Sequence, residues 1–254
     1  MPQLRDCVAL DTRGFASAAA GSGWWEPARL RALAGSEKAL GYARGPEKHA
    51  PEWAFLAADT TAPPFRAARR SVVVLGSGTV VAFDFVAPAA GGCRQFVAAN
   101  GAAEIGGNTF RAGGLHHTVF VPGAGEPILE AAPGGVLVTP PKRRDEALFL
   151  HVAQPGAALP PQLVWTIDLA GVRLGDRVIA FHGGSRMGQE PVFFDVDEGA
   201  VGMKFLLTGL APGAWDIWWK GWLEHPDAWV APEASTLYFE GPPGGYYFRR
   251  RSGV

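Results

Sequence analysis

The side chains best suited to acid–base chemistry fall in two short segments of this 254-residue chain. His116 and His117 are consecutive, and Tyr246-Tyr247 is followed closely by Arg249. Histidine and tyrosine can exchange protons with a substrate, and arginine can neutralise a carboxylate. If the two histidines lie on a strand, their side chains point to opposite faces, so only one of them can face a cleft. The alternative is that both are loop or surface residues.

The densest aromatic segment runs from Trp215 to Trp222. Alternation along a strand would place Trp215 and Trp219 on a core face, with Trp218 and Lys220 on the opposite, half-exposed face. Flat indole rings stack on sugars, and the indole N–H can bond a hydroxyl. We therefore expect a carbohydrate platform with Trp218, Trp222 and Lys220 as contacts. The alternative is that these tryptophans fill a core or a subunit interface.

Composition predicts a folded, soluble protein. Hydrophobic residues make up 48% of the chain and charged residues 19%, which suits a globular protein with a large core. The net charge of -1 argues against a general nucleic-acid surface. The basic runs Lys142-Arg143-Arg144 and Arg249-Arg250-Arg251 could each meet an acidic polymer or form a solvated loop. No stretch approaches the roughly 20 apolar residues of a membrane span.

The two cysteines and the N-terminus give little information about the cellular compartment of the protein. Cys7 and Cys93 lack the spacing of a metal-ligand motif, so we expect free thiols, with a single disulfide as the alternative. Residues 1–6 show no apolar core with a small-residue cleavage site, so no signal peptide is expected in this sequence. A protein that acts on glycans would be extracellular or periplasmic.

Glycine and proline divide the chain into short apolar runs. The 34 glycines and 21 prolines form turns and end strands, and runs of roughly five to eight residues are typical of strands. This pattern predicts an all-β fold, a large antiparallel β-sandwich or two stacked sheet subdomains, with a short N-terminal helical lead-in. Strands are expected near residues 71–75, 79–86, 94–98, 118–121, 135–138, 147–152, 162–167, 177–182, 191–196, 204–208, 214–220, 235–240 and 246–250.

The first fifty residues differ from the rest. Residues 25–34 have a proline near the start, leucines three apart and a glycine after the end, which predicts one short helix. We expect a lead-in over 1–52 and the first half of a sandwich over 53–154. Residues 155–254 would form the second half or an Ig-like C-terminal subdomain. The proline-rich segment 154–161 would connect the two.

Several short motifs occur in the order known from one family. They are FLAAD at 55–59, the hairpin strands SVVVL at 71–75 and VVAFDFV at 80–86, GNTF at 107–110, FLHV at 149–152, DRVIAF at 176–181, LAPGAW at 210–215 and LYFE at 237–240. From about residue 53 to the C-terminus, this order resembles the C-terminal β-sandwich region of heparinase II/III-like polysaccharide lyases.

The resemblance implies β-elimination on a uronic acid, which needs a base, an acid and a group that neutralises the carboxylate. The candidates are His116, His117, Tyr246 and Arg249, with Asn108 as a further ligand contact. Family lyases carry a catalytic α/α toroid before this region, and no room exists for one before Trp53. Where members often carry a histidine, this chain has the run 94–100, RQFVAAN. We therefore expect the chain to lack a complete lyase site.

The resemblance also implies that a structural zinc is conceivable, although no cofactor is the primary expectation. Three ligands on neighbouring strands would suffice, yet the sequence has no H-x-H or H-x₃-H motif. Structural, hydrogen-bonded histidines are the alternative. The candidate ligands are His151 and His182 above all, then His116 and His117, together with Asp195 or Asp176.

Three functions stay open at this level. The first is a non-catalytic β-sandwich module that binds acidic polysaccharide or forms a structural part of an assembly. The second is a polysaccharide lyase, or one chain of a split lyase with a separate partner. The third is a self-assembling surface or particle protein that works as a homo-oligomer. Nucleic acid is not expected as a partner in any of them.

Overall fold

A computed structural model of the chain describes residues 7–13, 15, 24–34, 39–46, 51–59, 65–89, 92–142, 145–156, 159–183, 192–196 and 202–251. Some sequence predictions fall outside these residues. They concern the N-terminal segment 1–6, Arg143 and Arg144 of the first basic run, residues 157–158 of the connector, and Pro191 at a predicted strand start. The side chain of Cys7 is also outside them, whereas Cys93 is buried.

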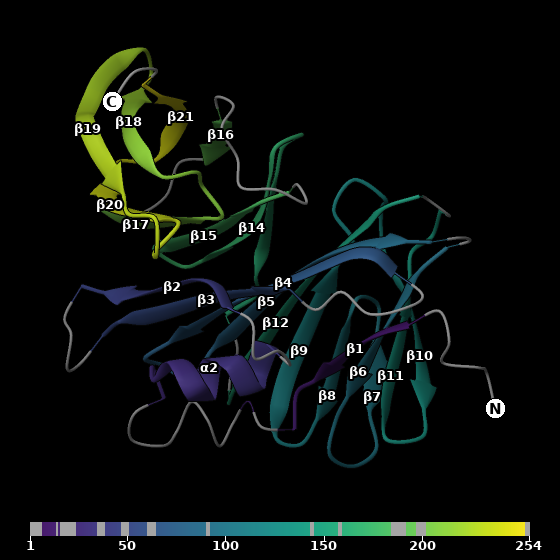
Figure 1. Ribbon diagram of the computed structural model, residues 1–254. Coiled ribbons are helices and arrows are strands. Elements are labelled where there is room, and N and C mark those ends of the chain that lie inside the picture. Colours follow the sequence, from purple (N-terminus) through teal and green to yellow (C-terminus); the bar gives the residue numbers. More distant parts are fainter. Residues whose placement is uncertain are drawn as a thin grey trace. The chain divides into compact units, whose positions relative to one another are not determined.

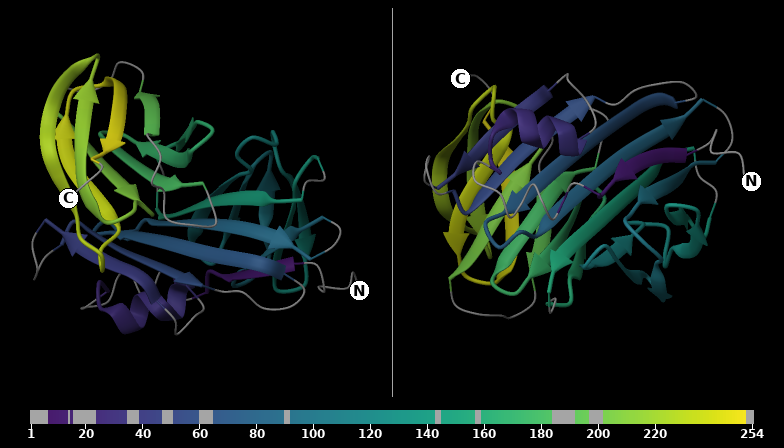
Figure 2. Two further views of the ribbon diagram at one scale, coloured as in Figure 1. Left: turned by 45° about the horizontal axis from the view of Figure 1, so that its top comes forward. Right: turned by 90° about the horizontal axis from the view of Figure 1, so that it is seen from below.

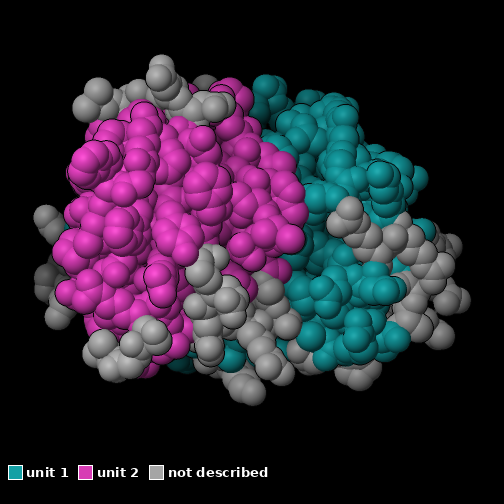
Figure 3. All heavy atoms as spheres, turned by 90° about the horizontal axis from the view of Figure 1, so that it is seen from above, with its two compact units in different colours: residues 1–158 teal, residues 159–254 magenta. Residues whose placement is uncertain are grey.

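The predicted all-β class is confirmed. Strands make up most of the described residues, and α2 (Pro27–Ala34) is the one helix with bounds among them. It coincides with the predicted helical lead-in, although it begins at Pro27. No described helix is long and apolar enough to cross a membrane. The chain divides into two compact units, residues 1–158 and 159–254, which Figure 3 distinguishes by colour.

Unit 1 contains a four-stranded sheet, β1-β6-β11-β10, and an eight-stranded sheet, β2-β3-β4-β5-β12-β9-β8-β7. Pairing is antiparallel except between β1 and β6. The predicted hairpin at 71–86 is present, and Gly78 supplies its positive φ of 84°. The strands are β1 (Cys7–Asp11), β2 (Ala39–Gly45), β3 (Trp53–Asp59), β4 (Phe65–Leu75), β5 (Val80–Pro88), β6 (Arg94–Ala98), β7 (Glu104–Gly106), β8 (Thr109–Ala112), β9 (Leu115–Phe120), β10 (Ile128–Ala132), β11 (Gly135–Thr139) and β12 (Ala147–Pro155).

Two apolar clusters cover one face of the eight-stranded sheet. Leu30 and Leu33 of α2 pack with Val72 of β4 and its neighbours. Further along the same face, Val97 and Val136 of the four-stranded sheet pack with Phe149 of β12. Figures 1 and 2 show α2 against the sheet at β3 and β4, away from β10 and β11. Because successive side chains of a strand point to opposite faces, every second residue of each strand points into these clusters.

Unit 2 is a sandwich of two sheets around one core. The first sheet has the order β13-β14-β15-β17-β20 and the second β16-β21-β18-β19. Trp215, Phe194, Phe205, Tyr246 and Phe248 fill the core between them and are fully buried. The strands are β13 (Gln162–Trp165), β14 (Leu169–Leu174), β15 (Arg177–His182), β16 (Val192–Val196), β17 (Met203–Thr208), β18 (Gly213–Trp219), β19 (Trp222–Val230), β20 (Thr236–Gly241) and β21 (Gly244–Arg250).

Candidate functional site

In the second sheet of unit 2, side chains alternate between the core and the outer surface. In β18, Trp215 and Ile217 are buried in the core. Trp218, the next residue after Ile217, is half-buried and faces outward. The same alternation in β21 buries Tyr246 and leaves Tyr247 39% exposed. The predicted division of the aromatic segment into a core face and a surface face therefore matches the arrangement in β18.

Aromatic and apolar residues form a row across the outer face of this sheet. Phe193 of β16 lies opposite Tyr247 of β21, Tyr247 lies opposite Trp218 of β18, and Trp218 lies opposite Leu223 of β19. Side chains in directly paired positions are about 5 Å apart at Cβ, so these neighbours are in contact range. Phe193 is 55% exposed, a large fraction for a phenylalanine side chain. We call Phe193, Tyr247 and Trp218 the aromatic platform.

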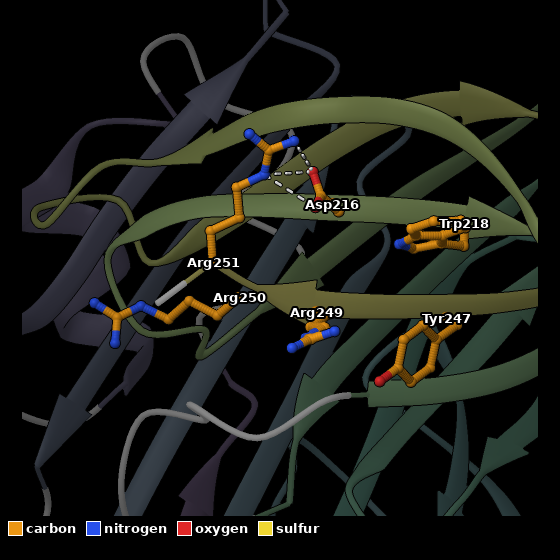
Figure 4. A pocket seen from close by; sticks show the side chains of 6 residues that line it. All are labelled: Asp216, Trp218, Tyr247, Arg249, Arg250 and Arg251. Atoms are coloured by element: carbon orange, nitrogen blue, oxygen red, sulfur yellow. Dashed lines mark hydrogen bonds and ion pairs between the residues drawn. The ribbon is translucent and has the colours of Figure 1, made fainter. Parts of the chain in front are cut away.

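Two hollows flank the platform and share Trp218 and Tyr247 as their common wall. The first, the apolar hollow, has a volume of about 340 Å³ and is completed by Phe193, Lys220, Gly221 and Gly245. The second, the cationic hollow, has a volume of about 260 Å³ and is completed by Asp216, Arg249, Arg250 and Arg251 (Figure 4). A ligand that crosses the platform would therefore meet an apolar surface on one side and guanidinium groups on the other.

A salt-bridge network organises the cationic hollow. The Arg251 Nε lies 2.9 Å from Asp216 Oδ1 and 3.0 Å from Oδ2, and Arg251 Nη1 lies 2.6 Å from Asp227 Oδ1. Hydrogen bonds from Arg251 hold the pKa of Asp216 below its usual range, and they raise that of Arg251. The charges of Asp216 and Arg251 are therefore fixed at neutral pH.

Arg249 is placed differently from its two neighbours. It is exposed, and within the described parts of the chain no hydrogen bond or ion pair engages its guanidinium. Figure 4 shows Arg249 beside Tyr247 and Arg250 directed away from both. Lys220, across the platform, is exposed and places its Nζ 5.0 Å from the centre of the Trp219 ring. Arg249 is thus an exposed cation of the hollow whose guanidinium is not held in the Arg251 network.

The structure brings together only some of the residues singled out from the sequence. Trp218, Lys220 and Arg249 line the two hollows. Trp222 is 75% exposed at the start of β19, paired in register with Trp219. Tyr246 lies inside the core of unit 2, where its hydroxyl donates to the Pro242 carbonyl at 2.6 Å and burial raises its pKa.

The remaining candidates on unit 1 occupy other surroundings. Asn108 lies between β7 and β8, and its side-chain amide donates to the Val119 carbonyl at 3.2 Å. His116 is half-buried on β9, whereas its neighbour His117 points inward and is 1% exposed. His182, at the end of β15, belongs to unit 2. The roles of His116 and His117 in catalysis, of Asn108 in ligand contact and of His182 in metal binding stay predictions.

His117 and His151 form a buried pair on the inner face of the large sheet. His117 Nδ1 lies 2.8 Å from His151 Nε2, and His117 Nε2 lies 3.4 Å from the Ala112 carbonyl. A carbonyl can only accept, so His117 Nε2 carries a hydrogen and His151 Nε2 donates to His117 Nδ1. Burial lowers the pKa of His117 to about 4, and burial also lowers the pKa of His151 well below its usual value. Both rings are therefore neutral at pH 7.

A charged cluster lies on the same inner face. Arg70 Nε and Nη2 each donate to one oxygen of Asp84 at 2.7 Å, and Gln95 donates to Asp84 Oδ2 at 2.8 Å. Both Asp84 oxygens are thus engaged by donors within the chain. Among the residues that the structure describes, no three histidine, cysteine or acidic side chains gather as a metal site. The structural zinc stays a sequence prediction.

Sequence reasoning missed Phe193 and Gly245, and it did not join Asp216 to Arg251. The signal for Phe193 was present, because Val192–Val196 alternates apolar and outward residues. Gly245 carries no signal of its own, since only the pairing of β16 with β21 shows that it forms the floor beneath Phe193.

Comparison with known proteins gives one informative match. No curated protein matches the chain in sequence. Among solved structures, the crystal structure of AerE from Microcystis aeruginosa is 12% identical, with a TM-score of 0.24 over 76% of this chain and 94% of that chain. Residues 164–250, from β13 to β21, match the family model of the heparinase II C-terminal domain. The chain thus carries a domain similar to the C-terminal domain of heparinase II, and this domain contains the platform and both hollows.

Proposed function

We propose that the protein is a non-catalytic β-sandwich module that binds acidic polysaccharide on the outer face of the sheet β16-β21-β18-β19. The observation that carries this proposal is the outward-facing aromatic row, Phe193, Tyr247 and the half-buried Trp218, in direct register across three strands. Exposed aromatic side chains in a contiguous row are costly to leave in water, and such patches mark binding sites. The similarity of residues 164–250 to a heparinase II domain supports a polysaccharide as the ligand.

The two hollows suit the two chemical faces of an acidic sugar. A pyranose presents C–H groups that pack on an aromatic ring, while the indole and phenol edges can bond its hydroxyls. The apolar hollow offers such a surface beside Trp218, and Arg249 offers a planar fork for a carboxylate or sulfate. We infer that one sugar lies over the platform and that an anionic substituent reaches Arg249.

The electrostatics of this face support binding more than bond cleavage. The carboxylate of Asp216 is held ionised by Arg251 and accepts several hydrogen bonds from it, so it is poorly placed to accept a proton from a substrate. Tyr246, a sequence candidate for proton transfer, has its hydroxyl bonded within the core. A second function does not gain comparable support from the described residues.

Titration of the purified protein with heparin, hyaluronan and alginate, with dextran as the neutral polymer, tests the proposal. We expect saturable binding of at least one acidic polymer, and Trp218→Ala should weaken it roughly tenfold or more, as for central aromatic contacts elsewhere. Ile167→Ala is the matched control, because Ile167 is 90% exposed and lies outside both hollows. Binding that is absent, or that Trp218→Ala leaves unchanged, would contradict the proposal. Release of unsaturated uronates would favour a lyase instead.

A further inference from the structure

We propose that Arg251 is a positioning residue that keeps Arg249 free for the ligand. Arg251 does this by occupying Asp216, which would otherwise pair with Arg249. The inference rests on the proposed function, since it assigns to Arg249 the anionic group of the polysaccharide. It assigns different roles to Arg249 and Arg251, which belong to a run of three consecutive arginines in the sequence.

The sheet register places Asp216 directly opposite Arg249. The two residues are paired across β18 and β21, and both side chains point to the outer face. Opposite charges in such positions attract each other, and an arginine readily forms a two-pronged contact with a carboxylate. In this structure, however, Asp216 makes its ion pair with Arg251 from the end of β21. The charge of Arg249 still lowers the pKa of Asp216, but no ion pair joins these two side chains.

The contacts of Asp216 explain why it pairs with Arg251 rather than with Arg249. Arg251 contacts both carboxylate oxygens through Nε and contacts Oδ1 again through Nη2 at 2.9 Å. The Asp227 backbone N–H donates to the same Oδ1 at 3.3 Å. The Asp216 side chain is only 15% exposed, and its lowered pKa agrees with this set of donors. Arg249, with none of these contacts, is exposed beside the platform.

A bulge in β19 places Asp227 where it contacts both Asp216 and Arg251. Between the pairs Trp215–Ala228 and Ile217–His225, β18 has one residue and β19 has two. Asp227 is the second of those two and has a φ of 56°, a conformation that aspartate tolerates better than most residues. Its N–H then faces Asp216, and its carboxylate lies 2.6 Å from Arg251 Nη1. Arg251 is thus anchored at two carboxylates on two strands.

Arg251→Gln removes the anchor, so Asp216 should turn to Arg249 and compete with the ligand. We expect heparin binding to weaken about two- to fivefold, the range of a cross-strand charge pair. The double variant Arg251→Gln/Asp216→Asn removes the competitor and should restore binding. The variant Arg251→Gln/Asp227→Asn has the same net charge but keeps Asp216, so it should stay weak. This comparison separates capture of Arg249 from a simple change in charge.

A second measurement needs no polysaccharide. Phenylglyoxal modifies accessible arginines, and peptide mass spectrometry can follow its rate at Arg249 in each variant. Arg249 should react more slowly in Arg251→Gln and in Arg251→Gln/Asp227→Asn than in the wild-type chain, and at the wild-type rate in Arg251→Gln/Asp216→Asn. Thermal melting of every variant checks that the sandwich of unit 2 stays folded.

The outcomes distinguish this inference from the proposed function. Equal recovery in both double variants would overturn it, as would wild-type heparin binding in Arg251→Gln or an unchanged Arg249 modification rate. If the wild-type chain bound no acidic polymer while Arg249 reactivity followed the expected pattern, the proposed function would fail and the capture of Arg249 by Asp216 would stand. Heparin binding with recovery through Asp216→Asn alone supports both.

Discussion

At the scale of a single residue, Gly245 determines the depth of the apolar hollow. It occupies an outward position of β21 between Tyr247 and the turn, opposite Asp195 of β16. A Cβ at this position would meet the Phe193 ring at 3.8 Å and Asp195 Cγ at 4.0 Å, which are ordinary contacts. The neighbouring Gly244 could not be changed so simply, since its φ is 132° and a Cβ there would come within 2.8 Å of Lys220 Cε.

Gly245→Ala should therefore reduce polysaccharide binding without unfolding the protein. The added methyl group fills the floor on which a sugar ring would rest, and we expect affinity to fall about three- to tenfold. Stability should change by less than about 1 kcal/mol, because alanine fits the site and restricts the unfolded chain. Heparin titration and thermal melting measure the two effects. Gly106→Ala, at an open position of unit 1, is the control; unchanged affinity in Gly245→Ala would place the sugar elsewhere.

The strands of unit 1 carry a pH-sensitive element in the His117–His151 pair. His117 on β9 and His151 on β12 lie in adjacent strands, and Arg70 on β4 contributes a positive charge that further lowers the pKa of His151. Phe110 stacks on the His117 ring at 4.3 Å between centres. An imidazolium in this place would lose its hydration and meet a second cation, so the folded state disfavours protonation.

We expect the protein to lose stability as the pH falls from about 6.5 to about 4. The unfolded His117 binds a proton near pH 6.5 but the folded residue only near pH 4, so the unfolded state holds more protons throughout this window. His117 alone should contribute roughly 3 kcal/mol of stability at neutral pH that disappears by pH 4. Denaturant unfolding at several pH values measures the slope. His117→Gln should reduce this slope, with His151 left to contribute the rest, and His116→Gln should not change it; equal slopes in all three proteins would refute the assignment.

Local patterns in the sequence predicted most individual strands but not their partners. Residues 94–98 and 177–182 coincide with β6 and β15, because clear apolar runs are bounded by turn residues. β14 was missed because Gly171 interrupts its apolar run. That glycine is required by close packing, since a Cβ there would clash with the Ile179 carbonyl oxygen. β19 was missed because Pro226 and exposed residues dominate it, which an edge strand tolerates.

In the candidate site, too, the sequence predicts side-chain orientation within one strand but not the contacts that depend on strand pairing. Alternation within the Trp215–Trp222 segment was enough to predict that Trp218 and Lys220 face outward. It could not reveal that Phe193 would lie in the same row, because β16 and β21 are about fifty residues apart in sequence and meet only through the sheet register. The Asp216–Arg251 contact depends on the same register, together with the β19 bulge.

At the scale of the whole molecule, each unit has its own hydrophobic core. The core of unit 2 is formed by side chains from both of its sheets, with Trp215, Phe205 and Tyr246 among the largest buried groups. The platform, both hollows and the Arg251 network all belong to this unit. A compact part with its own core can fold as an independent domain. The binding function proposed above should therefore be separable from unit 1.

Residues 159–254, produced alone, should fold cooperatively and bind heparin within about threefold of the affinity of the whole chain. The expectation follows from the buried aromatic core and from the described residues that line the two hollows, all of which belong to unit 2. Thermal melting followed by circular dichroism tests folding, and calorimetric titration tests binding. Trp218→Ala in the same fragment provides the negative control. A fragment that melts cooperatively yet binds far more weakly than the whole chain would show that unit 1 contributes ligand contacts.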